Sequence, residues 1–316
     1  MTRFTSIRFA AACAILPAAP LWADTIQTDE GMPSASAIET INTADGTGGR
    51  MTVPVVVNGQ GPFHFIIDTG ADRTVISREL AARLNLPEGR KSRLVSISGA
   101  HDVRTVKIDR LQMARKETRQ ITAPALPQRY LGADGILGID SLKNQRVVFD
   151  FVTQTMTVEP ADTKEIRTEK DPVGTITVTA KSKLGQLVLV DADAQGQDIR
   201  VIVDTGGQNS VGNSALRRMM AHPGTGVTFK PVELISVVGE RLPADYAIVG
   251  QMRIGGIRIG NAAIAFADAH PFSKFGLTKR PAMLLGMESL RAFRRVSIDF
   301  ANRRVKFLMP QGAPIG

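Results

Sequence analysis

The chain has 316 residues, of which 43% are hydrophobic and 22% are charged, so its composition is that of an ordinary globular protein with room for two domains. Lys and Arg outnumber Asp and Glu by 39 to 30, which gives a formal net charge of +9. Aromatic residues make up only 5% and are not interleaved with the basic ones, and we therefore expect no nucleic-acid partner.

The first 23 residues have the pattern of a secretory signal peptide. Arg3 and Arg8 supply its positive start, residues 9–21 are mostly Ala, Ile and Leu, and Ala23 is a small residue before a cleavage site. An uncleaved anchor, a buried strand and a lipoprotein site at Cys13 are the alternatives, although little apolar sequence precedes Cys13. We expect export to the periplasm or the medium, with no stable membrane insertion after cleavage.

Cys13 is the only cysteine, so the cleaved chain would have no disulfide and no thiol chemistry. Cleavage would also remove two arginines and no acid, which lowers the formal net charge from +9 to +7. A basic protein can approach anionic envelope surfaces or acidic partners, but an ordinary solvated surface with excess Arg is the simpler interpretation.

Residues 24–48 are rich in Thr, Ser, Ala, Gly and acids without any period, which predicts a flexible lead-in or a short pro-segment. From 49 to 160 the pattern is that of a β lobe. Ser77 is expected to cap a short helix over 77–86. The expected strands cover 51–57, 63–67, 147–151 and 155–158, with a hairpin inside the alternating run 94–113.

A charged stretch with flanking prolines at 161–173 is the expected linker, and residues 174–310 then repeat the pattern of the first lobe. A helix is expected over 213–220, and Gly255-Gly256 predicts a tight hairpin. The expected strands cover 175–180, 186–190, 199–203 and 296–300, with a second alternating run at 227–252. The chain is therefore predicted to contain an internal duplication.

One short motif occurs in both halves, 136 residues apart. Each copy follows an apolar strand and places an aspartate on a turn that glycine permits. A chance Asp-Thr-Gly has a probability of order 0.1 in a chain of this size, and two copies have one of order 0.01 or less. A later apolar pair followed by glycine also recurs, at Gly138 and Gly286. The two copies are Asp68-Thr69-Gly70-Ala71 and Asp204-Thr205-Gly206-Gly207.

These motifs resemble those of the aspartic proteases. The run 68–76 is similar to a retropepsin active-site strand, and two such units in one chain resemble the two-lobed pepsin arrangement and exported bacterial retropepsin-like proteases with duplicated lobes. The resemblance covers about residues 51–309. It implies an all-β fold of two barrel-like lobes with short helices, related by a pseudo-two-fold axis.

The resemblance also implies roles for individual residues. Asp68 and Asp204 would be the catalytic pair, and the apolar runs 136–138 and 284–286 would thread the two loops that carry them. The residues that would support these loops are Thr69, Gly70, Thr205 and Gly206, with the two threonines joined by reciprocal hydrogen bonds.

Two carboxylates about 3 Å apart cannot both ionise, so they share one proton. The ionised partner would take a proton from a water, which then attacks a peptide carbonyl polarised by the protonated partner. This chemistry needs no metal and no cofactor, and we expect none. Because such a pair titrates as a unit, the sequence does not assign the proton to Asp68 or to Asp204.

The sequence departs from the pepsin pattern at two places. Pepsin-like sites have a hydroxyl residue after the glycine, whereas here Ala71 and Gly207 stand there. Without that hydrogen-bond donor we predict less depressed pKa values and a pH optimum nearer neutrality than pepsin's. Secondly, the first copy has Asp72 at a position that contacts the substrate main chain in retropepsins. The second copy has Gln208 at this position, so the two halves of the cleft differ.

Two hairpin tips, at Gly99 and Gly239, are the candidate flaps, with ordinary β-turns as the alternative interpretation. Together with the flap glycines, the expected substrate-binding residues are Ala71, Asp72 and Gly207. His101 lies close to the first tip. Asp191, Asp193 and Asp198 fall short of a calcium loop in spacing and number.

From the sequence we therefore expect an exported aspartic endopeptidase that works as a monomer on polypeptide substrates. A binding module that holds a peptide or an envelope protein on the same fold without cutting it is the alternative. A structural envelope protein is a third interpretation, but it leaves the repeated Asp-Thr-Gly unexplained.

Overall fold

The computed structural model describes residues 39–42, 44–45, 50–113, 116–142, 145–161, 171–183, 186–189 and 191–310. All of them belong to one compact unit that begins at Ser36. The predicted signal peptide, Cys13, most of the lead-in and most of the linker lie outside the described residues.

The first lobe is a closed β barrel. Its strands are hydrogen-bonded in the order β3-β4-β10-β5-β9-β8, and β3 also pairs with β8, which closes the ring. A short strand, β2, flanks β3 on the outside of this ring. The strands are β2 (Ala44–Asp45), β3 (Met51–Val57), β4 (Gln60–Ile67), β5 (Val75–Ser77), β8 (Thr105–Met113), β9 (Lys116–Leu126) and β10 (Gly135–Leu137).

The second lobe repeats this arrangement. Its strands follow the order β14-β17-β22-β18-β21-β20-β15-β16. In the first lobe β10 runs parallel to β4, with Ile136 opposite Ile66, and in the second β22 runs parallel to β17, with Leu284 opposite Ile202. The strands are β14 (Gln186–Leu189), β15 (Ala192–Ala194), β16 (Gln197–Asp198), β17 (Arg200–Val203), β18 (Ser210–Gly212), β20 (Arg241–Ile254), β21 (Ile257–Phe266) and β22 (Ala282–Leu285). The predicted duplication and the all-β, two-lobed fold are confirmed.

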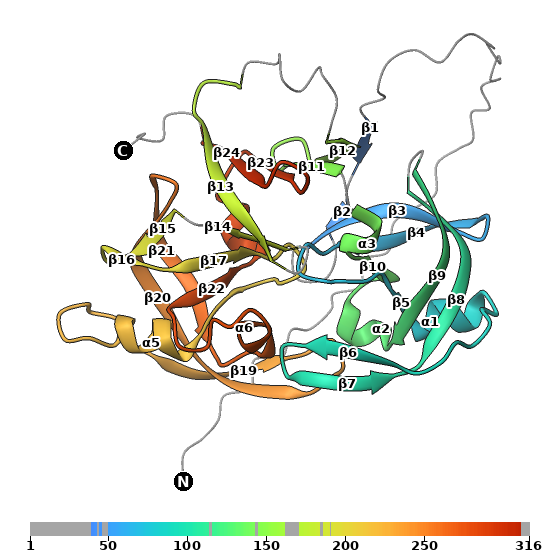
Figure 1. Cartoon of the computed structure of the whole chain (residues 1–316), viewed down its shortest axis with the longest axis horizontal. Coiled ribbons are helices and arrows are strands. Elements are labelled where there is room, and N and C mark those ends of the chain that lie inside the picture. Colours follow the sequence, from blue (N-terminus) through green and yellow to red (C-terminus); the bar gives the residue numbers. More distant parts are fainter. Residues whose placement is uncertain are drawn as a thin grey trace, which may run out of the picture. The chain divides into compact units, whose positions relative to one another are not determined.

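A six-stranded stretch of sheet joins the lobes, in the order β1-β12-β11-β23-β24-β13 (Figure 1). Its central ladder pairs β11 of the first lobe with β23 of the second, antiparallel, with Val148 opposite Ser297. The strands are β1 (Glu39–Asn42), β11 (Gln145–Asp150), β12 (Thr155–Pro160), β13 (Thr175–Lys183), β23 (Arg295–Asp299) and β24 (Arg304–Leu308).

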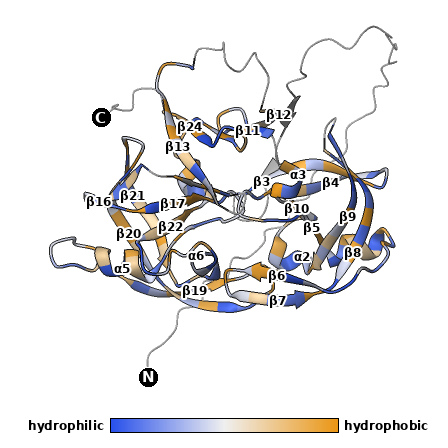
Figure 2. Ribbon diagram, in the orientation of Figure 1, coloured by the Kyte–Doolittle hydropathy of each residue, from blue (hydrophilic) through white to orange (hydrophobic). Residues whose placement is uncertain are grey.

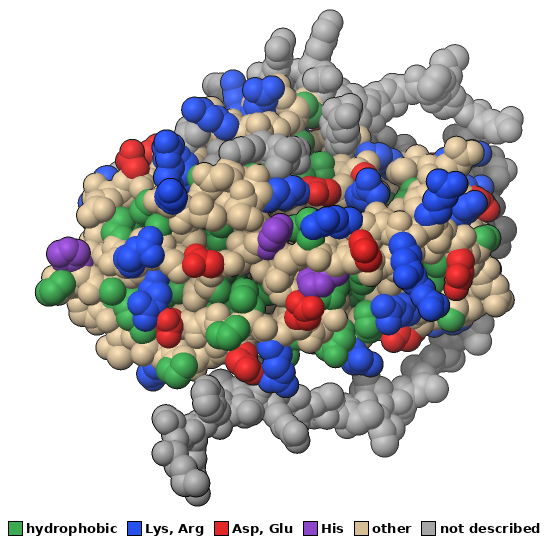
Figure 3. Space-filling view, turned by 60° about the horizontal axis from the view of Figure 1, so that its bottom comes forward, with side chains coloured by type: hydrophobic (Ala, Val, Ile, Leu, Met, Phe, Trp, Pro, Cys, Tyr) green, Lys and Arg blue, Asp and Glu red, His purple; other side chains and the backbone are tan. Residues whose placement is uncertain are grey.

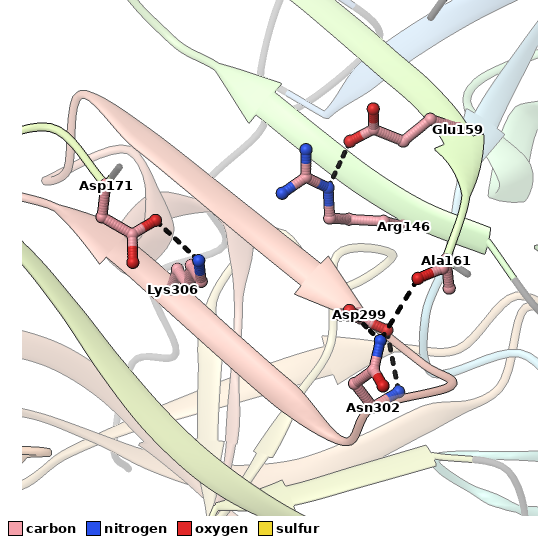
Figure 4. A network of polar contacts seen from close by, with 7 residues as sticks. All are labelled: Arg146, Glu159, Ala161, Asp171, Asp299, Asn302 and Lys306. Carbon is pink, nitrogen blue, oxygen red and sulfur yellow. Dashed lines mark hydrogen bonds and ion pairs between the residues drawn. The ribbon is translucent and has the colours of Figure 1, made fainter. Parts of the chain in front are cut away.

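Polar contacts connect the strands and turns of this joining sheet (Figure 4). The Asn302 side chain donates to the Ala161 carbonyl at 3.3 Å and to the Asp299 carboxylate at 2.8 Å. Arg146 and Glu159 form an ion pair between neighbouring strands, with side chains only 13% and 3% exposed. Because burial of two charges costs desolvation energy that offsets their attraction, this ion pair is weak evidence for added stability.

Hydrophobic residues alternate with hydrophilic ones along many of the strands, as the colouring of Figure 2 shows. One buried cluster extends through both lobes and the joining sheet, and it includes Phe65, Phe149 and Phe307 with no exposed surface. Burial of each such side chain contributes about 2–3 kcal/mol. The two lobes therefore share one hydrophobic core.

The helices are short. Ser77 caps α1 (Arg78–Arg83), as predicted, and its hydroxyl accepts from the Leu80 amide at 3.0 Å. The helix ends earlier than the predicted residue 86, because Asn85 has a left-handed backbone with φ of 48°. Asn213 caps α5 (Ser214–Met220) in the same way. The remaining helices are α2 (Gln128–Leu131), α3 (Ile139–Leu142), α6 (His270–Lys274) and α7 (Met287–Leu290).

The lead-in prediction is wrong for part of its length. Residues 39–42 and 44–45 are not a flexible lead-in but the strands β1 and β2, paired with β12 and β3. β1 has a single apolar residue, Ile41, and β2 is only two residues long, so neither shows a hydrophobic period in the sequence.

Each lobe has one hairpin that extends toward the other lobe. The first is formed by β6 (Ser92–Ser96) and β7 (Gly99–Val103), and the second by β19 (Lys230–Ile235) and the start of β20.

On the face shown in Figure 3, Lys and Arg side chains are interspersed with Asp and Glu. Within the described ranges, no helix has the length and apolar character needed to cross a bilayer.

Candidate active site

Asp68 and Asp204 each stand one residue beyond the end of a strand, β4 and β17. The Asp68 amide donates to the Leu137 carbonyl and the Asp204 amide to the Leu285 carbonyl, both at 3.0 Å. These bonds attach each aspartate loop to the parallel strand beside it, β10 or β22. In both strands the last three residues, 65–67 and 201–203, are apolar and buried, and the aspartate is the first polar residue after them.

The two loops meet through their threonines. The Thr69 amide donates to the Thr205 hydroxyl oxygen at 3.0 Å, and the Thr205 amide donates to that of Thr69 at 3.1 Å. Each hydroxyl in turn donates to the opposite lobe, Thr69 to the Val203 carbonyl at 2.9 Å and Thr205 to the Ile67 carbonyl at 2.7 Å. Both threonines are buried. The reciprocal hydrogen bonds implied by the resemblance are therefore present.

The two carboxyl groups are held alike by main-chain amides. Gly70 and Ala71 donate to Asp68 Oδ1 at 2.7 and 3.0 Å. On the other lobe Asp204 Oδ1 accepts from the next two amides of its own loop, at 3.1 and 3.0 Å. A β-carbon on Gly70 would lie 3.0 Å from Asp68 Oδ1 and 2.7 Å from Asp204 Oδ1, so the two carboxyls lie side by side. Each has one oxygen fixed by its own loop.

Glycine at the third position of each motif makes this arrangement possible. A β-carbon on Gly70 would lie 2.7 Å from Asp204 Oδ1, and one on Gly206 would overlap the Asp68 carboxyl. Each glycine therefore leaves space for the aspartate of the opposite lobe. Any other residue at Gly70 or Gly206 would push the two carboxyls apart.

The environment makes both carboxyls hard to ionise. Burial, and next the charge of Asp204, raise the pKa of Asp68 to about 7, although the amides of Gly70 and Ala71 and the charge of Arg50 work against the shift. Burial also raises the pKa of Asp204, against the amides of its loop, its bond to Asp68 and Arg50. The direction agrees with the prediction made from the missing hydroxyls at Ala71 and Gly207, where amides are the donors.

Arg50, which no motif in the sequence marks, lies beside this pair. It precedes β3, and its guanidinium donates to the Leu131 carbonyl at 2.7 Å and to the Gly206 carbonyl at 3.4 Å. Burial lowers the pKa of Arg50, but an arginine keeps its charge at any physiological pH. Gln186 of the second lobe donates to the Gly70 carbonyl. The 136-residue period pairs Arg50 with Gln186, and that alignment was the signal that could have found them.

The two predicted flap glycines lie in the hairpins that cross between lobes. Gly99 begins β7, and the carbonyl of Ile97 at this tip accepts from the His270 amide of the second lobe at 3.0 Å. Gly239 has φ of +88°, and a β-carbon there would overlap the ring of Tyr130 in the first lobe. His101 and Glu240 bring the two hairpins together, at 3.4 Å.

The fifth position of the motif differs between the lobes. Asp72 forms an ion pair with Lys274 of the second lobe, with 2.5 Å between Oδ2 and Nζ. Gln208, its counterpart, is exposed, and its carbonyl accepts from the Glu288 amide at 3.0 Å. The predicted difference between the two halves is therefore present as a difference in side-chain charge. In the part of the chain that the structure describes, no group of three His, Cys, Asp or Glu side chains is placed to hold a metal ion.

Comparison with protein families agrees with this geometry. Residues 53–144 match the family model described as "gag-polyprotein putative aspartyl protease", and residues 190–289 match the one described as "Aspartyl protease". A comparison with curated proteins found no match. The first match contains Asp68 and the second contains Asp204, one in each barrel. With two such domains in tandem, the chain belongs to the retropepsin-like aspartic proteases.

Proposed function

We propose that this protein is an aspartic endopeptidase that hydrolyses peptide bonds with a water activated by Asp68 and Asp204. The observation that supports this most is a pair of carboxyls that lie side by side, each held by the amides of its own loop, in an environment that raises the pKa of both. Aspartic-type protease activity is what the two family domains support in general. The mechanism and the roles of the two residues are our proposal.

In the proposed reaction the pair holds one proton and one negative charge. The ionised carboxyl takes a proton from a water, and that water attacks the peptide carbonyl carbon. The protonated carboxyl donates to the carbonyl oxygen, so a neutral tetrahedral diol forms. Collapse of the diol transfers a proton to the leaving amine and restores the singly protonated pair. The fixed loops keep the geometry unchanged through both proton transfers.

The two crossing hairpins are proposed to cover a substrate bound at the carboxyl pair. Val237 and Val238 of the second hairpin pack against the buried cluster of the first lobe that also adjoins Ala71, and Ile97 of the first hairpin packs against a cluster of the second lobe. A hairpin held by the opposite lobe would exclude water from the reaction.

Gly239→Ala tests this role. The added methyl needs space occupied by the Tyr130 ring, on a backbone that L side chains rarely adopt, so the tip should move away from the first lobe. We expect kcat/KM for peptide cleavage to fall about 10-fold. The strained backbone should lower the unfolding midpoint as well, in this variant and in the control alike. The matched control is Gly196→Ala. Gly196 also has a positive φ, of +75°, but an added β-carbon there would meet no atom within 4 Å. Equal losses in both variants would contradict the role.

We also propose that the protein acts outside the cytoplasm, as the signal-peptide pattern of residues 1–23 indicates. Both aspartates come from one chain, so a monomer would be sufficient for activity. Detection of the tagged protein in cell fractions, and its mass in solution, test these two points. Cytoplasmic retention of the uncleaved chain, or an activity that is lost on dilution to the monomer, would contradict them.

Digestion of an extended peptide library by the purified chain tests the proposed function. We expect internal cleavage, with oxygen from solvent water in the new carboxyl terminus, since water is the proposed nucleophile. The alternative, a module that binds peptides without cutting them, predicts retention of library members with intact masses. Intact peptides at every pH tested would reject the endopeptidase.

A further inference from the structure

Arg50 and Gln186 occupy matching positions in the two lobes. They are 136 residues apart, as Asp68 and Asp204 are. The strand registers agree, because the residue two positions later is paired in the same way in each lobe: Thr52 with Ile66, and Val188 with Ile202. A difference between Arg50 and Gln186 is therefore a difference between the two halves of one pseudo-symmetric site.

Both side chains reach across to the glycine turn of the opposite lobe. The Arg50 guanidinium donates to the Gly206 carbonyl at 3.4 Å, and the Gln186 amide donates to the Gly70 carbonyl. The contacts are reciprocal in geometry, but only the one from the first lobe carries a charge. Arg50 is fixed further by its 2.7 Å bond to the Leu131 carbonyl, at the end of α2.

The residue that Arg50 contacts touches both carboxyls. The Gly206 amide donates to Asp204 Oδ1 at 3.1 Å, and its α-carbon lies so close to Asp68 that a β-carbon would overlap the carboxyl. A single residue, Gly206, therefore lies between the guanidinium and each of the two carboxyls. Gln186 has the same relation to Gly70 and supplies no charge.

We propose that Arg50 is a positioning residue for the proposed hydrolysis, which ties the first lobe to the Gly206 turn and supplies, from one side only, the positive charge that stabilises the anionic state of the Asp68–Asp204 pair. This inference rests on the proposed function, because the singly ionised pair is the reactive state there. Burial alone would keep the pair fully protonated to higher pH, and the nearby cation offsets part of that effect.

The other charged groups on neighbouring elements mostly have partners of their own. Asp72 pairs with Lys274, and His101 pairs with Glu240. Asp140 accepts from Thr74. Arg73 and Glu288 are exposed. Arg50 differs from all of these in its position at the glycine turn, and its charge acts on both carboxyls.

The direction of the effect follows from charge. A cation favours the ionised form of a nearby carboxyl, so it lowers both the pH at which the pair loses its first proton and the pH at which it loses its second. Arg50→Gln, which copies the residue of the second lobe, should move both limbs of the pH–rate profile up by about one pH unit. Gln186→Arg, which adds a cation on the other side, should move both limbs down.

The experiment measures kcat/KM for a cleaved peptide against pH, with the full chain and the variants Arg50→Gln, Arg50→Lys, Gln186→Arg and Gln186→Ala. The infrared signal of protonated carboxyls, assigned with Asp68→Asn, is titrated in the same proteins without substrate. We expect Arg50→Lys to stay close to the wild-type limbs because it keeps the charge. Gln186→Ala removes the matching cross-lobe contact without any charge change, so it should lower stability and leave the limbs in place.

The outcomes separate the two proposals. Unmoved limbs in Arg50→Gln, or an equal shift in Gln186→Ala, would overturn the role of Arg50 while cleavage still supports the protease. If no peptide is cleaved but the infrared titration shifts up in Arg50→Gln, the endopeptidase fails and the action of Arg50 on the pair stands. If Arg50→Gln does not fold, Gln186→Arg decides, because the absence of a downward shift in it would overturn the proposal.

Discussion

Asp204→Asn should abolish peptide cleavage, with kcat/KM reduced about 10³-fold or more, while the variant still folds. An asparagine can still accept the amides of Gly206 and Gly207 through its Oδ1, so the loop keeps its hydrogen bonds. What disappears is the shared proton, because an amide neither takes a proton from water nor returns one. Asp68→Asn should have the same effect, since the pair acts as one unit.

The control for this prediction is Asp193→Asn. Asp193 lies in the same lobe as Asp204 but in β15, where it accepts from Arg253 at 2.7 Å and from the Gly196 amide at 3.2 Å. We expect its cleavage rate to stay within about 2-fold of the wild type, because exposed ion pairs contribute little. Turnover that survives in either Asp68→Asn or Asp204→Asn would reject the proposed mechanism, provided that the product masses show cleavage at the same peptide bond.

The second large effect concerns stability. Because the pKa of Asp68 is raised from its ordinary 3.8 to about 7, the folded state binds this proton more tightly than the unfolded state. The resulting stabilisation is fully present below pH 3.8 and is lost as the pH rises to about 7. We expect the free energy of unfolding to fall by a few kcal/mol over this range, because each pH unit between the two pKa values changes it by about 1.4 kcal/mol.

Asp68→Asn should weaken this dependence without removing it, since one proton of the pair is gone while burial still raises the pKa of Asp204. Urea unfolding of both proteins at a series of pH values through this window measures it. Groups with lowered pKa act elsewhere: burial works against the shift of Asp150, but hydrogen bonds from Thr153 and Arg295 lower its pKa, so its contribution is lost only at pH below 3.8. An equal pH dependence in Asp68→Asn and the wild type would contradict the account of the carboxyl pair.

Much of the fold could be predicted because the chain repeats itself. The two Asp-Thr-Gly motifs, the later apolar strands and the cap at Ser77 are local signals with a mechanical meaning, and each lies where the sequence indicated. The edge strand β1 could not be predicted, because its four residues contain a single apolar one and show no alternation. The one-turn helices α2 and α6 were missed for a similar reason, since a single turn is too short to show a period.

The site was predictable only in part. The aspartates, threonines and glycines are contiguous in sequence, so a motif reveals them. Arg50 lies 18 residues before Asp68 in an unremarkable context, and its partner Gly206 belongs to the other lobe. Contacts such as Lys274 with Asp72, or Tyr130 with Gly239, likewise join residues that only the folded chain brings together. A residue-by-residue alignment of the two halves would have exposed Arg50 and Gln186, but not what they touch.

The pH–rate profile of kcat/KM for one cleaved peptide tests the central claim, that two carboxyls lying side by side share a proton whose release is delayed by burial. We expect a bell-shaped profile with an acid limb above pH 3.8, an alkaline limb near pH 7 and a maximum between them. A profile that peaks at strongly acid pH, or a rate that does not fall on both sides, would contradict it.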